Sequence, residues 1–219
     1  MPKNIILRLF AAAAVLLPLQ LFAFEDLNEA QALIYDTSHL QNTSASQTVD
    51  YDYIYTDSKT GETINDRVRL SVRKEQDADR RDVSIDFLSE ERRMPLPNFD
   101  GYRANPVIIA MLEHLAQTMG RDTGGGVLYF RNRIRDGLAG EDIEIIDSAA
   151  APEKDSPAFK EFVIRPFTGD PYLAERPEYT EAQISLRFSE SVPGQVLSIK
   201  LVSGPEDEPL IRRELSLKP

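Results

Sequence analysis

Arginines are concentrated in one short stretch of the chain, directly after a run of three glycines. The glycines occupy positions 124–126, and Arg131, Arg133 and Arg135 follow them. In a helix over residues 127–138, Arg131 and Arg135 would share one face, and the glycine run would lead into a helix N-terminus, where free backbone amides favour anions. The stretch therefore predicts either two packed helices with solvated arginines or a site for a polyanion or a carboxylate.

A second group of residues with chemical potential is a ladder of tyrosines. Tyr51, Tyr53 and Tyr55 alternate with polar residues, so they would lie on one face of a strand. Such a ladder is typical of core or cross-strand packing, but tyrosine also suits a half-wet cavity because its ring is apolar and its hydroxyl is polar. We take Tyr51 and Tyr53, together with Arg131 and Arg135, as the candidate ligand-binding residues.

The sequence contains few residues arranged for catalysis. His39 and His114 are its two histidines, and neither has a neighbour at metal-ligand spacing. No Gly-x-Ser-x-Gly nucleophile elbow is present. A hydrolase built around His114, Asp122 and Tyr129 remains as the alternative to a binding protein. We assign no catalytic residue, no metal site and no cofactor.

Residues 1–23 have the pattern of a secretory signal peptide. Lys3 and Arg8 stand at the start, an apolar run covers 9–17, and Ala23 supplies the small residue before a cleavage point. The apolar run is too short for a comfortable membrane-spanning helix, and no second one follows. We expect an exported, periplasmic protein without an integral membrane span, with a single domain over residues 24–219.

The composition narrows the class of protein further. The absence of cysteine excludes an anchoring lipidated cysteine, disulfides, thiolate catalysis and cysteine metal sites. Removal of residues 1–23 would take the formal net charge from −11 to −13, because Lys3 and Arg8 leave with them. A chain this acidic is a poor candidate for binding nucleic acid or an anionic membrane surface. We therefore expect no nucleic-acid partner.

The centre of the chain predicts one long amphipathic helix. Asn105 is suited to the N-cap and Pro106 to the first helical position. Gly120 is placed to end the helix in a left-handed conformation. Apolar residues recur at spacings of three and four, at Ile108, Met111, Leu112, Leu115 and Met119. This stripe must cover something, and a β-sheet is the large candidate. For residues 127–138 the pattern fits a strand or a helix, and spacings of four favour the helix.

The rest of the chain alternates between apolar and polar residues with a period of two. Such alternation is typical of antiparallel strands with one wet face. It predicts about eight strands, near residues 49–55, 68–72, 83–87, 143–145, 162–164, 184–188, 197–201 and 211–217. A short helix is expected within 24–40, and residues 92–102 read as an extended connection. The fold class is α+β, with one large curved antiparallel sheet, an N-terminal helix and a central two-helix insertion.

This order of elements in an exported, cysteine-free chain resembles the bacterial lipoprotein-carrier (LolA-like) fold. The resemblance lies in the architecture over most of residues 24–219 and involves no specific motif, so it transfers no functional residue. In that family, helices cover the concave face of the sheet and an acyl chain takes their place. The resemblance implies a carrier of an apolar ligand or a lipoprotein.

Two functional hypotheses follow from these observations. The first is a non-enzymatic binding or carrier protein with an apolar-ligand or acyl-chain site between sheet and helices, where the glycines at 124–126 would let the helices move. The second is the envelope hydrolase described above, or an adaptor that contacts envelope proteins. The competing view is a fully packed core without a cavity, since protein interiors are normally close-packed. Such a core would contradict the first hypothesis.

Overall fold

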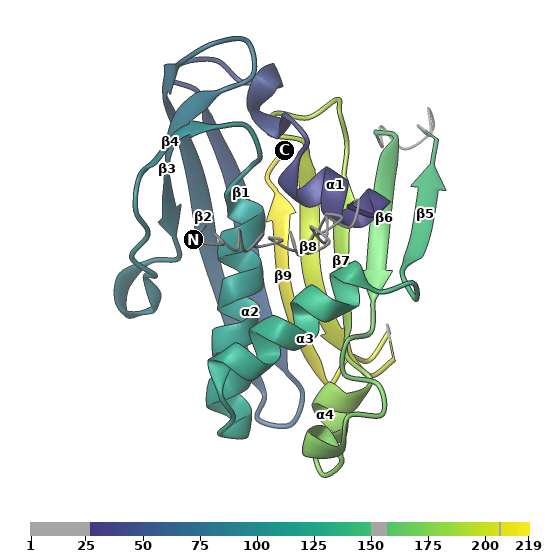
Figure 1. The fold of residues 1–219 in the computed structure, drawn as a ribbon. Helices are drawn as coiled ribbons and strands as arrows, with labels where there is room; N and C mark the ends of the chain where they lie inside the picture. Colours follow the sequence, from purple (N-terminus) through teal and green to yellow (C-terminus); the bar gives the residue numbers. More distant parts are fainter. Residues whose placement is uncertain (1–26, 150–156, 206) are drawn as a thin grey trace, which may run out of the picture.

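The computed structural model describes residues 27–149, 157–205 and 207–219. Residues 1–23, where the sequence predicts a signal peptide, lie outside the described residues. The described chain forms one antiparallel sheet of nine strands in the order β4-β3-β2-β1-β9-β8-β7-β6-β5, with helices on one face (Figure 1). This arrangement confirms the predicted α+β class with a single large antiparallel sheet, a short N-terminal helix and a two-helix insertion.

The strands follow the alternation seen in the sequence. Their bounds are β1 Thr48–Asp57, β2 Glu62–Glu75, β3 Arg81–Phe87, β4 Phe99–Tyr102, β5 Glu144–Ser148, β6 Phe159–Ile164, β7 Gln183–Phe188, β8 Val196–Ser203 and β9 Ile211–Leu217. Eight of them coincide with the predicted strands. The ninth, β4, falls within the predicted extended connection and was missed, because it has four residues and follows a stretch with two prolines.

The helical elements are short except for two. Their bounds are α1 Glu29–Tyr35, η1 His39–Asn42, η2 Glu90–Arg92, α2 Val107–Thr123, α3 Val127–Ala139, η4 Pro171–Leu173 and α4 Pro177–Thr180. Helix α3 resolves the ambiguity of residues 127–138 in favour of a helix. Helix α1 covers only part of the predicted range 24–40, and its N-cap Asn28 forms a capping box with Gln31.

The topology requires the two central helices to cross the sheet. Strands β1 to β4 form one meander and β5 to β9 another, and β1 pairs with β9 to join them. Strands β4 and β5 are consecutive among the strands of the chain but lie at opposite edges of the sheet. The connection between them must therefore traverse one face, and α2 and α3 do so (Figure 1).

Both ends of α2 differ in detail from the sequence prediction. The helix begins at Val107 with Pro106 at its N-cap, so Asn105, the predicted N-cap, lies one residue before the cap. Asn105 still accepts a hydrogen bond from the Val107 amide at 3.1 Å, and its own amide group donates to the Gly194 carbonyl oxygen at 2.9 Å. It ends at Thr123 rather than at Gly120. Gly124 takes the left-handed conformation with φ of 74°, so the helix is one turn longer than predicted. Gly120 instead lies against Gly125 and Val127, where a side chain would crowd the neighbouring turn.

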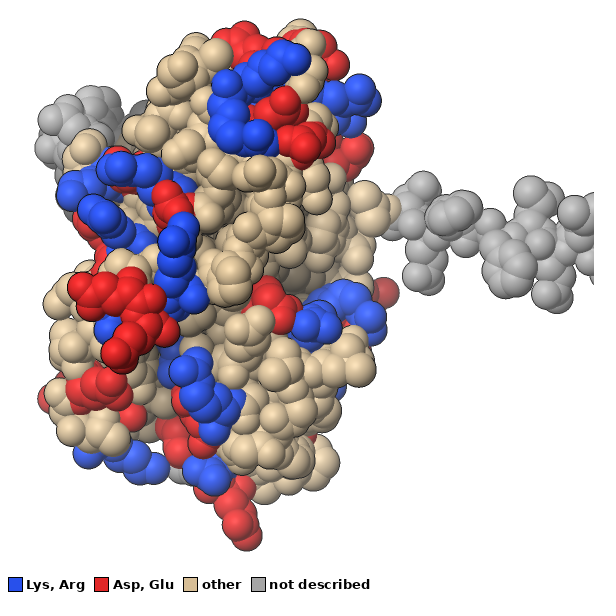
Figure 2. Space-filling view, turned by 90° about the vertical axis from the view of Figure 1, so that its left-hand side faces the viewer, with Lys and Arg blue, Asp and Glu red and all other residues tan. Residues whose placement is uncertain are grey.

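Charges of both signs are mixed on the surface. On the face at the β4 edge of the sheet, basic and acidic side chains lie next to each other (Figure 2). Arg69 pairs with Asp50 at 2.6 Å, and Arg93 pairs with Asp86 at 2.8 Å. The negative net charge is therefore not gathered into a single field on this face.

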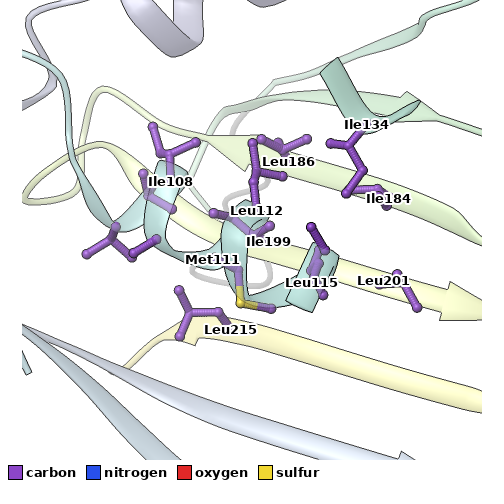
Figure 3. Packing of buried hydrophobic residues seen from close by; sticks show 14 of the residues in the cluster. Ile108, Met111, Leu112, Leu115, Ile134, Ile184, Leu186, Ile199, Leu201 and Leu215 are labelled. Atoms are coloured by element: carbon purple, nitrogen blue, oxygen red, sulfur yellow. The ribbon is translucent and has the colours of Figure 1, made fainter. Parts of the chain in front are cut away.

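The apolar stripe of α2 packs on the sheet as predicted. Ile108, Met111 and Leu115 are fully buried. They point toward apolar side chains of the second meander, labelled in Figure 3 as Ile184, Leu186, Ile199, Leu201 and Leu215. Burial of a side chain of this kind contributes about 1.5–3 kcal/mol, so the stripe accounts for the docking of α2.

Replacement of Leu115 by aspartate should lower the free energy of unfolding by about 3–5 kcal/mol, because it places an unpaired charge in this contact. Leu128→Asp on α3 is the matched control, since Leu128 is 61% exposed, and it should change stability by less than about 0.5 kcal/mol. Urea denaturation followed by circular dichroism measures both. Equal effects of the two substitutions would contradict the docking of α2 on the sheet.

Candidate functional site

A hollow of about 770 Å³ lies between α2 and the first meander. Its walls come from β1, β2 and β9, from α2, and from the connection between β3 and β4. The lining residues are Tyr53, Tyr55, Glu62, Ile64, Leu88, Glu91, Arg92, Arg93, Met94, Pro95, His114, Gln117, Thr118, Arg121, Asp122 and Arg213. Helix α2 packs directly on the second meander, so the hollow is left on its other side.

The wall of this hollow has two kinds of surface. The sheet and the β3–β4 connection supply apolar groups, among them Tyr53, Ile64 and Met94, together with the charged residues Glu62, Glu91, Arg92, Arg93 and Arg213. Helix α2 supplies polar groups, because residues 114, 117, 118, 121 and 122 recur at spacings of three and four and form a second stripe beside its apolar one. The hollow is therefore mixed in character, with apolar groups on the strands and polar or charged groups around them.

Arg213 of β9 is at the centre of the polar side. Its side chain is only 4% exposed, and its Nη2 donates to Asp122 Oδ2 at 2.6 Å. The guanidinium carbon lies 4.4 Å from the centre of the Tyr55 ring, a cation–π contact. The hydroxyl of Tyr179 donates to the same carboxylate oxygen at 2.6 Å. Asp122 therefore links α2 to β9 and to α4 through one carboxylate.

The guanidinium of Arg213 stays charged in this setting. Burial acts to lower its pKa, but Tyr179 and Asp122 beside it outweigh burial, and the pKa is raised. The sequence analysis did not single out this residue. The signal was present, since Ile211, Arg213 and Leu215 alternate along β9 and therefore share the inward face.

Tyr53 and His114 form the second polar pair of the hollow. The Tyr53 hydroxyl lies 3.0 Å from His114 Nε2, and the two rings meet edge to face. Burial, with a further contribution from the positive charge of Arg213, lowers the pKa of His114 to about 4. Burial also raises the pKa of Tyr53 to about 12. Both side chains are therefore uncharged near neutral pH, and they satisfy each other by hydrogen bonding.

The four candidate ligand-binding residues are not brought together. Tyr53 lines the hollow, whereas Tyr51 is fully buried outside its lining and accepts a hydrogen bond from Asn105 at 3.2 Å. Arg131 and Arg135 border a different hollow of about 270 Å³, between α2 and α3. Arg131 donates twice to Glu113, at 2.8 Å each.

The three residues of the hydrolase hypothesis are also separated. His114 and Asp122 line the hollow between α2 and the first meander, two helical turns apart on α2. Tyr129 does not line it, and its hydroxyl donates to Asp170, which also pairs with Arg133 at 2.9 Å. Thr118 supplies the aliphatic hydroxyl among the lining residues, and it donates to the Leu115 carbonyl oxygen at 3.0 Å. None of the described lining residues is therefore positioned as an activated nucleophile.

A further hollow of about 940 Å³ lies near α1 and the second meander, bordered by Leu33, Phe159 and Phe188. It is also bordered by residues 149 and 157, on either side of the segment 150–156, which is outside the described residues. It carries no candidate from the sequence analysis.

No protein-family model matches the chain, and no curated protein matches its sequence significantly. Within the described ranges, no group of three or more histidine or acidic side chains is arranged so that it could hold a metal ion. None of the helices in the part of the chain that the structure describes is both long and apolar enough to span a membrane.

The lowered pKa of His114 predicts a loss of stability in acid. The pKa of His114 is about 4 in the folded chain, against an ordinary value of 6.5. Folding stability is therefore at its full value above about pH 6.5. It falls as the pH drops towards 4, because the unfolded chain binds the proton more readily than the folded chain does. Between about pH 7 and about pH 5, the wild type should lose about 2 kcal/mol more than His114→Gln.

Glutamine can still hydrogen-bond to Tyr53 but does not titrate. His39, also buried with a pKa lowered to about 4 by burial, titrates in both proteins, so the difference isolates His114. Denaturant unfolding of the two proteins across this pH range measures the effect. Parallel stability curves would show that His114 is not held neutral in the folded chain.

Proposed function

We propose that the protein is a non-enzymatic binding or carrier protein that takes an apolar ligand or an acyl chain between the sheet and the helices. The observation that carries this proposal is the hollow of about 770 Å³ between α2 and the first meander. Packed interiors leave few voids larger than a water molecule, whereas ligand sites are typically about 300–1,000 Å³. The hollow is therefore of the size that a small ligand needs.

The walls favour an amphiphilic ligand over a purely polar one. Tyr53, Tyr55 and Ile64 on the strands face the space, and Met94 and Pro95 border it from the β3–β4 connection. An alkyl chain placed against them would gain about 0.8 kcal/mol for each methylene removed from water. The polar residues of α2 and Arg213 would then face the ligand's polar end.

The hydrolase hypothesis has weaker support. His114 is paired with Tyr53, and Asp122 is paired with Arg213 and Tyr179. Neither is free to activate a water molecule or a hydroxyl without giving up one of these hydrogen bonds. The bond between His114 and Tyr53 is buried, so its loss costs about 1–3 kcal/mol. The predicted third member, Tyr129, lies elsewhere. We therefore favour binding without chemistry.

Binding of a pyrene-labelled fatty acid and of its methyl ester tests this function. We expect saturable binding of at least one probe to residues 24–219. Ile64→Trp fills part of the hollow and should weaken binding at least about tenfold, which corresponds to about 1.4 kcal/mol. Leu128→Trp, at an exposed position on α3, should leave the affinity unchanged. Absence of saturable binding of either probe would end the carrier proposal.

Arg131→Ala decides the role of the predicted arginines in the same assay. If the ligand lies in the hollow between α2 and the first meander, this substitution leaves the affinity unchanged, because Arg131 borders the hollow between α2 and α3. Weaker binding after Arg131→Ala, with no effect of Ile64→Trp, would place the site between α2 and α3 instead.

The cellular setting that we propose is the periplasm, where a lipoprotein or another envelope protein would be the partner. This proposal depends on the signal-peptide pattern of residues 1–23. Mass spectrometry of the protein from fractionated cells should find a mature N-terminus at Phe24 in the periplasmic fraction. A chain that retains Met1 in the cytoplasmic fraction would contradict export.

A further inference from the structure

We propose that Arg213 selects the ligand by donating a hydrogen bond to an uncharged acceptor oxygen, such as the carbonyl of an ester or an amide. This inference rests on the proposed binding function and adds the chemical class of the ligand's polar end. It follows from three features of Arg213: its burial, its unpartnered nitrogen and the charge already beside it.

Arg213 has a donor that the described residues leave unused. Its Nη2 donates to Asp122, but its buried Nη1 has no hydrogen-bond partner among the described residues. The side chain is 96% buried, being 4% exposed, and it lines the hollow. Buried donors in native proteins are rarely without a partner, because an unsatisfied one costs about 1–3 kcal/mol. Nη1 itself is closed to solvent, so an acceptor supplied by a ligand would remove this cost once a shift of the guanidinium or of the side chains over it opens Nη1 to the hollow.

The position of the guanidinium determines where the polar end of the ligand would lie. Arg213 stacks on Tyr55, and Tyr53 is the neighbour of Tyr55 on the same strand face. Because Arg213 covers the Tyr55 ring, a chain that lies along Tyr53 would end beside the guanidinium. The bound conformation would have its acceptor beside Arg213 and its alkyl chain along Ile64 and Met94.

The charge balance argues for an uncharged acceptor. Asp122 already pairs with Arg213 at 2.6 Å, and His114 beside them is neutral because burial lowers its pKa to about 4. A ligand carboxylate at Nη1 would therefore add a second negative charge to one buried positive charge. Burial of an uncompensated charge is strongly unfavourable, whereas a carbonyl oxygen satisfies the donor without adding charge.

The other charged residues around the hollow do not change this balance. Arg92 pairs with Asp66 at 2.9 Å and Arg93 pairs with Asp86 at 2.8 Å. The remaining charges in the lining are those of Arg121, Glu62 and Glu91. All three side chains are at least partly exposed to solvent, which screens them.

Three probes with the same alkyl chain test the inference by displacement of the pyrene-labelled methyl ester. They are methyl laurate, an alkane of equal length without any oxygen, and laurate at about pH 8, where the acid is ionised. In the wild type, methyl laurate should bind about tenfold more tightly than the alkane, because Arg213 can donate a hydrogen bond to the carbonyl oxygen of the ester and the alkane has no acceptor. It should also bind more tightly than laurate.

The variant pair Arg213→Met with Asp122→Asn removes the donor and keeps the charge balance of the site. In this double variant the tenfold preference for the ester over the alkane should disappear. Arg93→Met is the matched control, because Arg93 lines the same hollow but already pairs with Asp86, and it should keep the preference. A thermal melt confirms that each variant is folded. The comparison of the three probes on the wild type tests the inference even if a variant does not fold.

The outcomes separate this inference from the function on which it rests. Equal binding of ester and alkane to the wild type, tighter binding of laurate, or an unchanged preference in the double variant would each overturn the role of Arg213 while leaving the binding function in place. Failure of every probe, the pyrene-labelled ones included, would overturn both.

Discussion

The pairing of β1 with β9 is the interaction on which the rest of the structure depends. It joins two meanders that are otherwise separate into one sheet of nine strands. It also sets the register in which Tyr55 lies opposite Arg213 and Tyr53 lies opposite Leu215. A shift of this register by one residue would turn Arg213 to the other face of the sheet, because side chains alternate along a strand. The polar centre of the hollow is thus a consequence of strand register.

The route of the chain between the two outer strands determines where the hollow forms. Because β4 and β5 lie at opposite edges, α2 and α3 have to cross the sheet, and a pair of helices covers only part of so wide a surface. The apolar stripe of α2 packs on the second meander, against residues such as Leu201 and Leu215. Its polar stripe then faces the first meander, where the side chains do not fill the space.

A buried arginine is a costly way to build this interface. Moving the Arg213 guanidinium out of water costs several kcal/mol, and its attraction to Asp122, whose side chain is 30% exposed, offsets this only with good geometry and further hydrogen bonds. Tyr179 donates to Asp122 and Tyr55 stacks against Arg213, yet one nitrogen of Arg213 has no hydrogen-bond partner among the described residues. We propose that a bound ligand offsets part of this cost.

Local patterns in the sequence were enough to predict most of the secondary structure. Eight strands followed from alternation and α2 from its apolar stripe, and spacings of four correctly favoured a helix for α3. These patterns depend on residues a few positions apart, whose relative directions are set by backbone geometry. The end of α2 was misplaced by one turn because both Gly120 and Gly124 suited a helix end, and the close contact of Gly120 with Gly125 is visible only after folding.

The candidate site was decided by the tertiary structure. Of the four residues proposed as ligand-binding from the sequence, Tyr53 lines the hollow between α2 and the first meander, whereas Arg131 and Arg135 border another. Arg213 and Asp122 are 91 residues apart in the chain, and no local pattern relates them. They meet because strand pairing and the helical crossover each bring distant segments together. The sequence determined which elements form and which of their faces are apolar, and only the folded chain determined which polar residues share a cavity.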